Sequence, residues 1–420
     1  MSGGGITIIK HMITKDKEGL YYTLPFDVPD DVVKITVSYD YYKPTKGAMG
    51  DLKPSNTIDI GLMDEKGNFL GWSGSSHKTI YVGEHASSAG YLCQKIKPGK
   101  WQIIIGAYHV MDKGVEVTYE IDFEYKGEVL LYGDLHMHST ASDGVFSAYE
   151  LGRLAREKGL DFIGIANHNN FSENLALPHI DSLTFIPAVE WTHYNGHMNF
   201  FGVAAPFENS FIANTRQEMK SIITHAKSLG AVVSVNHPHC PICPYKWNDD
   251  NAFDMIEVWN GPMRKSNVKA IEWWTFFLRG GRHIPIVGGS DYHKPKQFAV
   301  LGNPVTGVYA PSRSAEDILT AIRNGNCFIT DNKDGVKIKL TYDGYVMGQT
   351  AVYKESSYLE IYADAKKITL VTDKGEKELT LKDGHIKVRL KEVKFAYIKV
   401  YKGLGKLKRI CAISNPIYFK

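Results

Sequence analysis

The stretch from Gly133 to Gly144, GDLHMHSTASDG, holds residues whose types and spacing suit metal chemistry. His136 and His138 stand at alternate positions just after the apolar run from Val129 to Tyr132. Alternate side chains of an extended strand share one face, so two imidazoles spaced in this way can bind one cation. Asp143 follows in a turn and is placed to serve a neighbouring ion. The stretch therefore predicts a metal-binding strand end.

Imidazole and carboxylate groups recur where later predicted strands end or begin. The full set of candidate metal ligands is His136, His138, Asp143, His168, Glu190, His197, His237, Asp291 and His293. Buried groups of these types need partners, and a shared cluster of divalent cations would satisfy all of them. Because the set offers nitrogen and oxygen without thiolate, it favours zinc, manganese or iron over magnesium or calcium. We expect two to three divalent ions, with one carboxylate bridging.

The elements that must position these groups begin at Val129, where strands start to alternate with helices. The expected helices run from Ser147 to Gly159, Thr215 to Leu229, Ser266 to about Leu278, and Ser314 to Asn324. The intervening strands are apolar throughout, which predicts a parallel sheet covered on both faces. Polar residues gather at the strand ends, where barrels of this class carry their chemistry.

The flanking regions have a different pattern, with short alternating strands and no helical stretch. We therefore expect an N-terminal β-sandwich domain at 1–128, the strand and helix region at 129–330, and a small C-terminal β domain at 331–420. Glycan or protein binding by the two β domains, with the central region as a non-catalytic scaffold, is one alternative to an enzyme.

The composition is that of an ordinary globular protein. Of 420 residues, 43% are hydrophobic and 23% are charged, and the formal net charge is +3. So small a charge does not imply nucleic acid or an anionic membrane as a partner. No apolar run reaches the ~18 residues of a membrane span, and no secretory leader is evident. We expect a cytoplasmic protein that requires neither nucleic acid nor membrane, and its oligomeric state stays open.

These motifs resemble those of the polymerase and histidinol phosphatase (PHP) superfamily of metal-dependent phosphoesterases. The resemblance rests on DLHMHSTASDG, on ANHN around His168, on Glu190, on the NHP from Asn236 to Pro238, and on GSDYH. Glu190 followed by GHMN at Gly196, the β domain in front and the ending AISNPIYF are similar to the CehA/McbA-type branch. The resemblance covers nearly the whole chain.

The resemblance implies an α/β fold, a distorted (β/α)7 TIM-like PHP barrel between the two β domains, with a trinuclear metal site. Carried onto this chain, it assigns His136, His138, Glu190 and Asp291 to a first ion. It assigns Glu190, His197 and His237 to a second ion, and Asp143, His168 and His293 to a third.

One position departs from the superfamily. The histidine of the second motif usually follows an aspartate that supports a ligand from behind, whereas Asn167 precedes His168 here. Changes to such supporting residues typically cost about 10 to 100-fold in affinity or activity. The third ion is therefore the one whose occupancy this departure affects.

The expected function is hydrolysis of a small phosphomonoester or phosphodiester, with a metal-bridging hydroxide as nucleophile. Two bridged cations lower the pKa of a bound water and neutralise charge on phosphoryl oxygens. The same chemistry can attack a carboxyl or carbamate ester, which is the leading enzymatic alternative. The residues expected in catalysis are Glu190, His193, Asp291 and His293, with His239 and Tyr292 as further candidates to protonate the leaving group.

Several side chains near the strand ends are candidates to bind substrate. They are Asn170, Asn199, Asn260, Arg264, Lys265 and Lys294. The cations would meet substrate oxyanions and the amides would donate hydrogen bonds, although solvated loop charges and turn caps explain them equally well.

Cysteine usage argues against a disulfide framework, because the chain has five cysteines. Cys240 and Cys243 follow His237 in the order HPHCPIC. A two-residue spacing suits zinc or a redox pair, but no second cysteine pair completes a zinc site. Packing of this loop over the site is the simpler interpretation.

Overall fold

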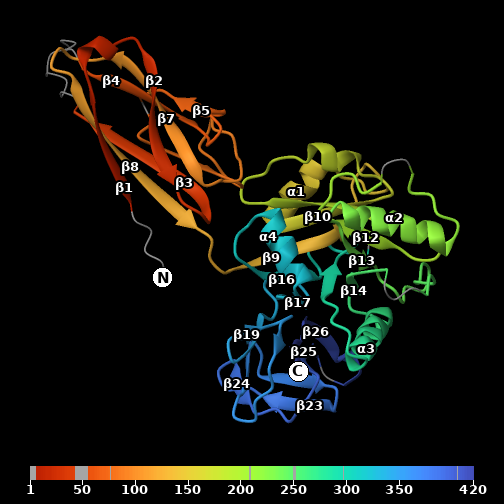
Figure 1. Ribbon diagram of the computed structural model, residues 1–420. Coiled ribbons are helices and arrows are strands. Elements are labelled where there is room, and N and C mark those ends of the chain that lie inside the picture. Colours follow the sequence, from red (N-terminus) through yellow and green to blue (C-terminus); the bar gives the residue numbers. More distant parts are fainter. Residues whose placement is uncertain are drawn as a thin grey trace. The chain divides into compact units, whose positions relative to one another are not determined.

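The computed structural model describes residues 6–42, 55–75, 77–207, 210–248, 252–296, 298–403 and 405–420. The protein is a mixed α/β protein in which strands far outnumber helices (Figure 1). The chain forms two compact units, Met1–Gly127 and Glu128–Lys420. Each unit has hydrophobic clusters of its own. The position expected for a third domain, 331, lies inside the second unit.

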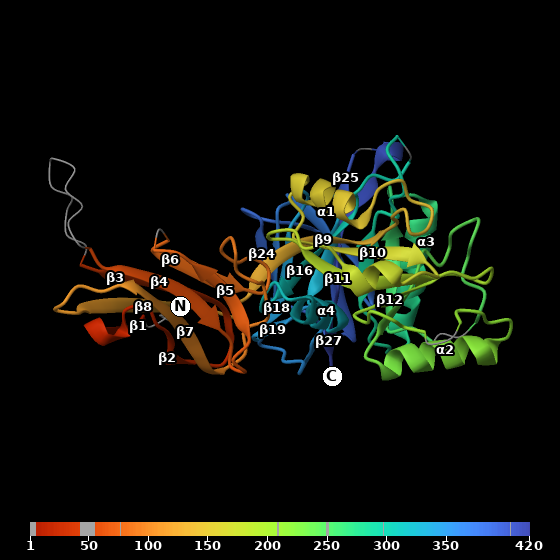
Figure 2. The same ribbon diagram turned by 90° about the horizontal axis from the view of Figure 1, so that it is seen from above.

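The first unit contains two four-stranded antiparallel sheets, ordered β1-β8-β3-β6 and β2-β7-β4-β5 among the described residues (Figure 2). Its strands are β1 (Thr7–Ile13), β2 (Tyr21–Val28), β3 (Val32–Tyr41), β4 (Thr57–Met63), β5 (Phe69–Ser73), β6 (Thr79–Gly83), β7 (Gly99–His109) and β8 (Val115–Tyr125). Buried and exposed side chains alternate along β8, and the buried ones join Trp101 and Ile35 in one cluster. This alternation is why the region was predictable as layered β-structure.

The second unit is built on a long mixed sheet. Its first strands are β9 (Val129–Met137), β10 (Phe162–His168), β11 (Thr184–Trp191), β12 (Met198–Phe201), β13 (Val232–Val235), β14 (Met255–Asn260), β15 (Ile286–Gly289), β16 (Val305–Ala310) and β17 (Cys327–Thr330). They follow one another in the order β15-β14-β13-β12-β11-β10-β9-β16-β17. The seven strands from β9 to β15 lie in sequence order and carry all the candidate ligands on or beside them.

The sheet is not parallel throughout, which corrects the sequence-based expectation. Strand β12 runs antiparallel to both β11 and β13. The link from Trp191 to Met198 is too short for the crossover that a parallel neighbour needs, so the chain turns back as a hairpin. As a result, His197 precedes its strand yet lies at the same edge as Glu190 near the end of β11.

A closed barrel is not confirmed by the strand pairing. The second edge of β9 is taken by β16, which pairs with it antiparallel from Gly133↔Thr306 to Val129↔Ala310. Strand β15 is close to β9 but does not pair with it as a ladder; the segment after β15 meets β9 at an isolated parallel bridge between Met137 and Tyr292. The sheet instead continues from β16 through β17 into the C-terminal strands.

The helices of the second unit lie close to where the sequence predicts them. They are α1 (Ala148–Glu157), α2 (Arg216–Ser228), α3 (Lys265–Arg279) and α4 (Ala315–Arg323), with short 3-10 turns at η1 (Lys15–Lys17), η2 (Ser172–Ala176) and η3 (Gly405–Leu407) elsewhere. Ser147 and Thr215 form capping boxes with Glu150 and Glu218, and Ser314 caps α4. These caps satisfy backbone N–H groups at the helix starts and explain why the N-terminal boundaries were readable.

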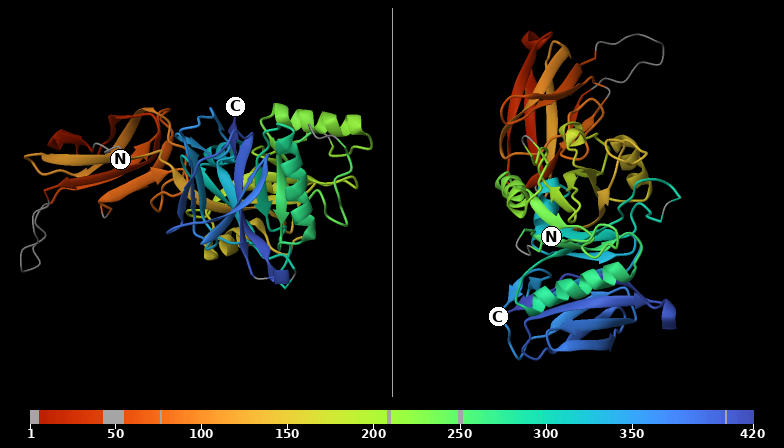
Figure 3. Two further views of the ribbon diagram at one scale, coloured as in Figure 1. Left: turned by 90° about the horizontal axis from the view of Figure 1, so that it is seen from below. Right: turned by 90° about the vertical axis from the view of Figure 1, so that its right-hand side faces the viewer.

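The C-terminal strands are β18 (Ile338–Tyr342), β19 (Tyr345–Val346), β20 (Thr350–Ala351), β21 (Leu359–Ala363), β22 (Lys367–Thr372), β23 (Gly375–Thr380), β24 (His385–Val388), β25 (Phe395–Lys402), β26 (Arg409–Ser414) and β27 (Ile417–Phe419). Strands β26, β25, β22 and β23 extend the long sheet, whereas β19, β18, β21 and β24 form another. Helix α3 lies along these C-terminal strands (Figure 3), with the ring of Trp274 4.7 Å from that of Tyr397.

A buried asparagine ties the C-terminal strands to β15 and β17. Asn415 accepts a hydrogen bond from the backbone N–H of Ile286 at 2.8 Å and donates to the carbonyl of the same residue at 3.1 Å. Its amide also donates to the carbonyl of Cys327 at 3.0 Å. Asn415 is fully buried, so its amide replaces backbone pairing that this corner of the sheet would otherwise lack.

Among the described residues, no helix combines the length and apolar character needed to cross a membrane.

Candidate metal centre

Glu190 lies at the centre of the candidate ligands. It is 1% exposed, and five histidine nitrogens surround its two carboxylate oxygens. These are His197 Nδ1 at 3.1 Å, His237 Nε2 at 3.3 Å and His136 Nε2 at 3.4 Å from Oε1, and His168 Nδ1 at 2.8 Å and His138 Nε2 at 3.7 Å from Oε2. One carboxylate thus faces ligands on both of its oxygens, the arrangement that bridging two cations requires.

Strand register explains how Glu190 reaches this position. In the parallel pairing of β10 and β11, Glu190 lies opposite His168, and in the antiparallel pairing of β11 and β12 it lies opposite Asn199. Residues opposite each other point to the same face of a sheet. His197, one residue before β12, follows at the same edge.

Asp291 is the second carboxylate of the cluster that lies against several histidines. Its Oδ1 lies 3.1 Å from His138 Nε2 and 3.5 Å from His136 Nε2. The backbone of Asp291 has φ +55°, and that of His237 has φ +28°, both in the left-handed region that non-glycine residues seldom adopt. Local backbone strain of this kind is concentrated at functional sites. In Asp291 it accompanies a hydrogen bond from its N–H to the carbonyl of His136 at 2.7 Å.

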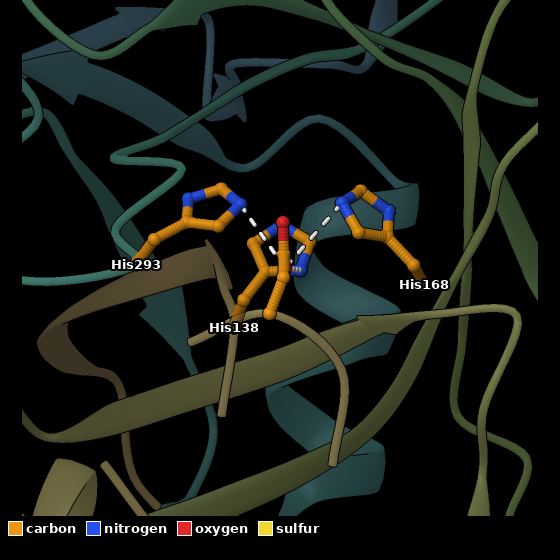
Figure 4. Close-up of side chains that lie close together, drawn as sticks. His138, His168 and His293 are labelled. Atoms are coloured by element: carbon orange, nitrogen blue, oxygen red, sulfur yellow. Dashed lines mark ion pairs between the residues drawn. The ribbon is translucent and has the colours of Figure 1, made fainter. Parts of the chain in front are cut away.

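Asp143 is the third such carboxylate. Its Oδ1 lies 3.4 Å from His293 Nε2, 3.6 Å from His168 Nε2 and 3.8 Å from His138 Nδ1. Figure 4 shows the ring of His138 between those of His168 and His293. The ring centroids of His138 lie 4.1 Å from His293 and 4.3 Å from His168. The structure thus brings all nine candidate ligands together.

The groupings overlap the implied partition at the first and third ions and differ from it at the second. Sets with the spacing to hold an ion include His136, His138 and Asp291, and also His138, Asp143, His168 and His293. His138 therefore lies near both the first and the third ion of the implied partition. Glu190, His197 and His237 do not form one such set; Glu190 groups with His136 and His237, and separately with His168 and His197.

Divalent cations fit this donor set. The buried atoms Nε2 of His136 and Nδ1 of His138 make no hydrogen bond within the described part of the chain, and both point into the cluster. A buried polar atom without a partner is costly, and a cation satisfies an imidazole nitrogen directly. Sets of His, Asp and Glu at this spacing support binding of divalent ions.

The charges of the cluster are strongly coupled. Burial opposes the charged form of His136, but the carboxylates of Glu257, Asp291 and Glu190 raise its pKa well above the usual value. Burial likewise opposes protonation of His237, whose pKa Glu190 nevertheless raises to about 9. Burial lowers the pKa of His138 to about 4. Despite their own burial, Glu190 and Asp291 have pKa values well below normal, chiefly because of His136.

Residues behind the ligands were missed by sequence reasoning. Glu257 Oε1 lies 2.9 Å from His136 Nδ1, and Thr192 Oγ1 lies 2.6 Å from His168 Nδ1. Asn236 donates to Glu190 Oε1 at 2.9 Å. Such partners fix the orientation of metal-binding side chains. Glu257 did carry a signal, because it is the lone carboxylate in the apolar strand MIEVWN and a buried carboxylate requires a partner.

Asn167, the position that departs from the superfamily, joins two parts of the centre. Its Oδ1 accepts hydrogen bonds from the N–H of Ser139 and the hydroxyl of Ser142, each at 2.9 Å. Its Nδ2 donates to Glu173 Oε2 at 2.9 Å, and Ser139 donates to the same oxygen at 2.5 Å. Glu173, from η2, thus supplies a carboxylate beside the turn that leads to Asp143.

The candidates for proton transfer lie outside the innermost cluster. The ring of His193 packs against Trp191 and Trp247, and its Nδ1 accepts a hydrogen bond from the N–H of Asn195 at 3.0 Å. His239 packs edge-on against Trp273. Tyr292 is 8% exposed and is stacked at 6.5 Å on Phe146, which packs on the same cluster.

A pocket of about 260 Å³ opens beside the centre. Asp291 and His293 form part of its wall, together with Asn260, Arg264 and Phe298. The guanidinium of Arg264 donates to Asn260 Oδ1 at 3.1 Å, which holds a positive charge at this wall. The pocket thus combines two candidate ligands with two of the candidate substrate-binding residues.

The remaining substrate candidates lie elsewhere. Asn170 uses both ends of its amide in backbone hydrogen bonds, donating to Ala141 and accepting from Ser172. Asn199 is 2% exposed on β12 beside Glu190. Lys265 and Lys294 are exposed.

No family model matches the chain. A stretch of 63 residues, 15% of the chain, is 38% identical to the DNA polymerase/3′-5′ exonuclease PolX of Bacillus subtilis (strain 168) and spans about a tenth of that protein's length, 11%.

Two solved structures are similar at lower identity. One, from Bacteroides vulgatus, is described as a two-domain protein containing a predicted PHP-like metal-dependent phosphoesterase (18% identity, 69% of this chain and 96% of that one, TM-score 0.41). The other is a lesion-specific endonuclease from Pyrococcus furiosus (17% identity, 61% and 65%, TM-score 0.36). The first description names the PHP-like class that the motifs resemble, and neither description names the CehA/McbA-type branch.

Proposed function

We propose that this chain is a metal-dependent phosphoesterase of the PHP superfamily that hydrolyses a small phosphomonoester or phosphodiester. The observation that carries the proposal is the position of Glu190, buried between His136, His197 and His237 on one oxygen and His168 on the other. A carboxylate so placed is suited to bridging two cations, and two-metal sites of this kind serve in-line displacement at phosphorus.

The proposed ligands are the nine residues predicted from the sequence, with two to three zinc, manganese or iron ions. When bound, the ions would lower the pKa of a coordinated water and neutralise charge on the phosphoryl oxygens. His136 and His138 would hold their ions from the floor of the site, where both are fully buried. Asp291 and His293, at the pocket wall, would hold theirs where substrate enters.

The residues of the pocket suggest how a phosphoester would be oriented. Arg264 would bind a non-reacting phosphoryl oxygen, since a guanidinium offers paired donors to such oxygens. Asn260, which donates to Glu257 and accepts from Arg264, would keep that guanidinium in place. Lys294 is proposed as a further, solvent-exposed contact to substrate. His193 would reach the leaving group only if its contacts with the two tryptophans change.

We further propose that β9 to β15 represent the distorted barrel of the superfamily in an incompletely paired form, placed between two β domains. This is supported by the bridge between Met137 and Tyr292 and by a hydrogen bond from the N–H of His138 to the carbonyl of Tyr292 at 2.9 Å. The first and last strands thus approach each other where the ligands lie.

The test is an assay of purified protein after expression in metal-replete medium. The bound metals would be measured by mass spectrometry, and hydrolysis would be followed with nitrophenyl phosphate, bis-nitrophenyl phosphate and nitrophenyl acetate. The proposal expects at least two ions per chain and turnover of a phosphate ester. Turnover of the acetate alone would support the carboxyl ester alternative instead. A metal-free and inactive protein would favour the non-catalytic scaffold.

A matched pair of variants makes this test specific. Glu190→Gln keeps the size of the side chain but removes the charge that faces five imidazoles, so metal content and activity should fall together, activity by about 100-fold or more. Glu355→Gln makes the same change at an exposed position and should leave both unchanged. Equal activity of the two variants would contradict the proposed role of Glu190.

A further inference from the structure

The loop after β13 brings two thiols together. The sulfur atoms of Cys240 and Cys243 lie 3.2 Å apart, and both side chains are half-buried. Ile242, between them in the sequence, is 91% exposed. A small molecule in solvent can therefore reach this loop, while the pair itself is held against the protein.

Backbone contacts hold the loop in place. The N–H of Cys240 bonds to the carbonyl of His237 at 2.8 Å, and the N–H of Tyr245 bonds to the carbonyl of Pro238 at 2.9 Å. Tyr245 packs so closely on Gly196 that a Cβ there would lie 2.8 Å from the Cα of Tyr245. The two sulfurs are therefore close because the loop is anchored at both ends.

The same pair contacts a proposed metal ligand. Cys243 Sγ lies 3.7 Å from His237 Nδ1, while Nε2 of that ring lies 3.3 Å from Glu190 Oε1. In His136, the nitrogen that points away from Glu190 has an oxygen partner, Glu257 Oε1. In His237, the partner of the nitrogen that points away from Glu190 is the sulfur of Cys243.

We propose that Cys240 and Cys243 form a reversible disulfide that weakens metal binding through His237. This inference rests on the proposed function, since it takes His237 as a ligand. Cys243 is here a positioning residue, which orients the ring so that Nε2 faces Glu190.

The chemistry is thiol–disulfide exchange with a small-molecule disulfide such as oxidised glutathione. The thiolate of one cysteine attacks a sulfur of the oxidant and releases one glutathione thiol, leaving a mixed disulfide. The thiolate of the second cysteine then displaces the other glutathione. The two cysteines lose two electrons and two protons, and the oxidant gains them as two thiols. A reducing thiol reverses both steps.

Closing the bond changes what His237 meets. A disulfide is about 2.05 Å long, so the two sulfurs must approach by about 1 Å. The sulfur of Cys243 thereby moves and, bonded to a second sulfur, becomes a poorer partner for the imidazole N–H of His237. Losing such a supporting partner typically costs about 10 to 100-fold in metal affinity.

The test compares the reduced and the oxidised full-length protein after metal has been removed with a chelator. One sample is held in dithiothreitol and the other in oxidised glutathione. Differential alkylation and peptide mapping then report the bonds formed, and competition with a chelating dye reports the affinity for Mn²⁺ and Zn²⁺. We expect a Cys240–Cys243 disulfide and at least one ion bound about 10-fold more weakly in the oxidised form.

Three variants isolate the effect. C240S keeps the sulfur behind His237 but cannot form the bond, so it should bind metal like the reduced protein in both conditions, once intact mass has shown it free of glutathione. C243S should bind more weakly in both conditions. C93S, at the half-buried Cys93, should respond like the parent protein.

The outcomes separate this inference from the proposed function. Absence of the Cys240–Cys243 disulfide, or equal metal affinity with and without it, overturns the inference alone. If neither form binds metal, the proposed function fails and the inference with it.

Discussion

At the scale of single residues, the centre depends on carboxylates that serve different purposes. Glu190 and Asp291 face the imidazoles directly, whereas Glu257 lies behind them and contacts His136 Nδ1. Oxygen Oε2 of Glu257 also accepts hydrogen bonds from the N–H of His237 and from Asn260, at 3.2 Å each. This one buried side chain thus supports two of the proposed ligands.

The variant Glu257→Gln should therefore weaken metal binding without removing a ligand. The amide keeps the shape but loses the charge that stabilises His136, so we expect affinity to fall about 10 to 100-fold. A chelator competition assay measures this, and circular dichroism checks that the fold is kept. Unchanged affinity would show that Glu257 has a packing role only.

The protonation of the cluster leads to a second prediction at this scale. Glu190 raises the pKa of His237 to about 9, and Glu257, Asp291 and Glu190 raise the pKa of His136 well above its usual value, so both rings favour the charged form at neutral pH without metal. A metal-binding imidazole must be neutral. Binding should therefore release protons, and apparent affinity should rise with pH up to about pH 9, by about tenfold per pH unit for each proton released.

Calorimetry in buffers of different ionisation enthalpy measures this release directly. The binding enthalpy should vary linearly with the buffer's ionisation enthalpy, with a slope of one proton or more at neutral pH. A binding enthalpy that is the same in every buffer would contradict the prediction.

The sequence was informative at this scale for residues that share a strand end. The nine candidate ligands could be selected because imidazoles and carboxylates are unusual beside apolar strands, and the structure brings them together. The partners of Glu257, Thr192 and Cys243 could not be predicted, because they depend on contacts that the spacing of residues does not encode. Glu257 is 121 positions from His136.

At the scale of elements, strand β15 packs so closely against β9 that only glycine fits at position 289. A Cβ added at Gly289 would lie 2.4 Å from the Cβ of His136 and 2.9 Å from Glu257 Oε1. Glycine is required here because the backbone of one strand meets the side chains of two others. The small residue lets His136 and Glu257 meet.

Gly289→Ala should disturb stability and metal binding together. Overpacking of a filled interior typically costs about 1 to 3 kcal/mol, and displacement of His136 should lower metal affinity. Urea unfolding and chelator competition measure the two effects. Gly127→Ala is the matched control, because a Cβ there meets nothing within 4 Å. Parent-like stability of both variants would show that the strands can move apart.

Helices were easier to predict than the pairing of strands. Ser147 and Thr215 cap their helices through hydrogen bonds to residues three positions later. Both partners therefore lie within a short stretch of sequence, which makes the helix start predictable. The antiparallel direction of β12 could have been predicted, because the connection from Trp191 to Met198 is too short for a parallel crossover. The pairing of β9 with β16 could not, because either β15 or β16 fits the same apolar edge, and only the whole fold decides between them.

At the scale of the whole molecule, the nine proposed ligands and their supporting partners all belong to Glu128–Lys420. The hydrophobic clusters of that unit contain no residue of the cluster that fills Met1–Gly127. The sequence analysis predicted a domain boundary near residue 128, where short alternating strands give way to strands that alternate with helices. The continuity of the long sheet past residue 331 was not visible, because short alternating strands look the same whether they start a new sheet or extend an old one.

A protein shortened to residues 128–420 should consequently keep the metal centre. We expect the same number of ions per chain and activity within about twofold of the full chain, because no proposed ligand or core residue of this unit is lost. Metal analysis and the phosphate ester assay measure both. A shortened protein that folds but binds no metal would contradict this assignment of the centre.

Asn415 has a consequence for the order in which the protein matures. Strand β15 lies just before Asp291. Its residue Ile286 forms two hydrogen bonds with the side chain of Asn415, which is synthesised more than a hundred residues later. During synthesis, all nine proposed ligands therefore leave the ribosome before Asn415 is available to complete the hydrogen bonds of β15. We expect a nascent chain that stops short of Asn415 to hold Asp291 less firmly than the full chain does.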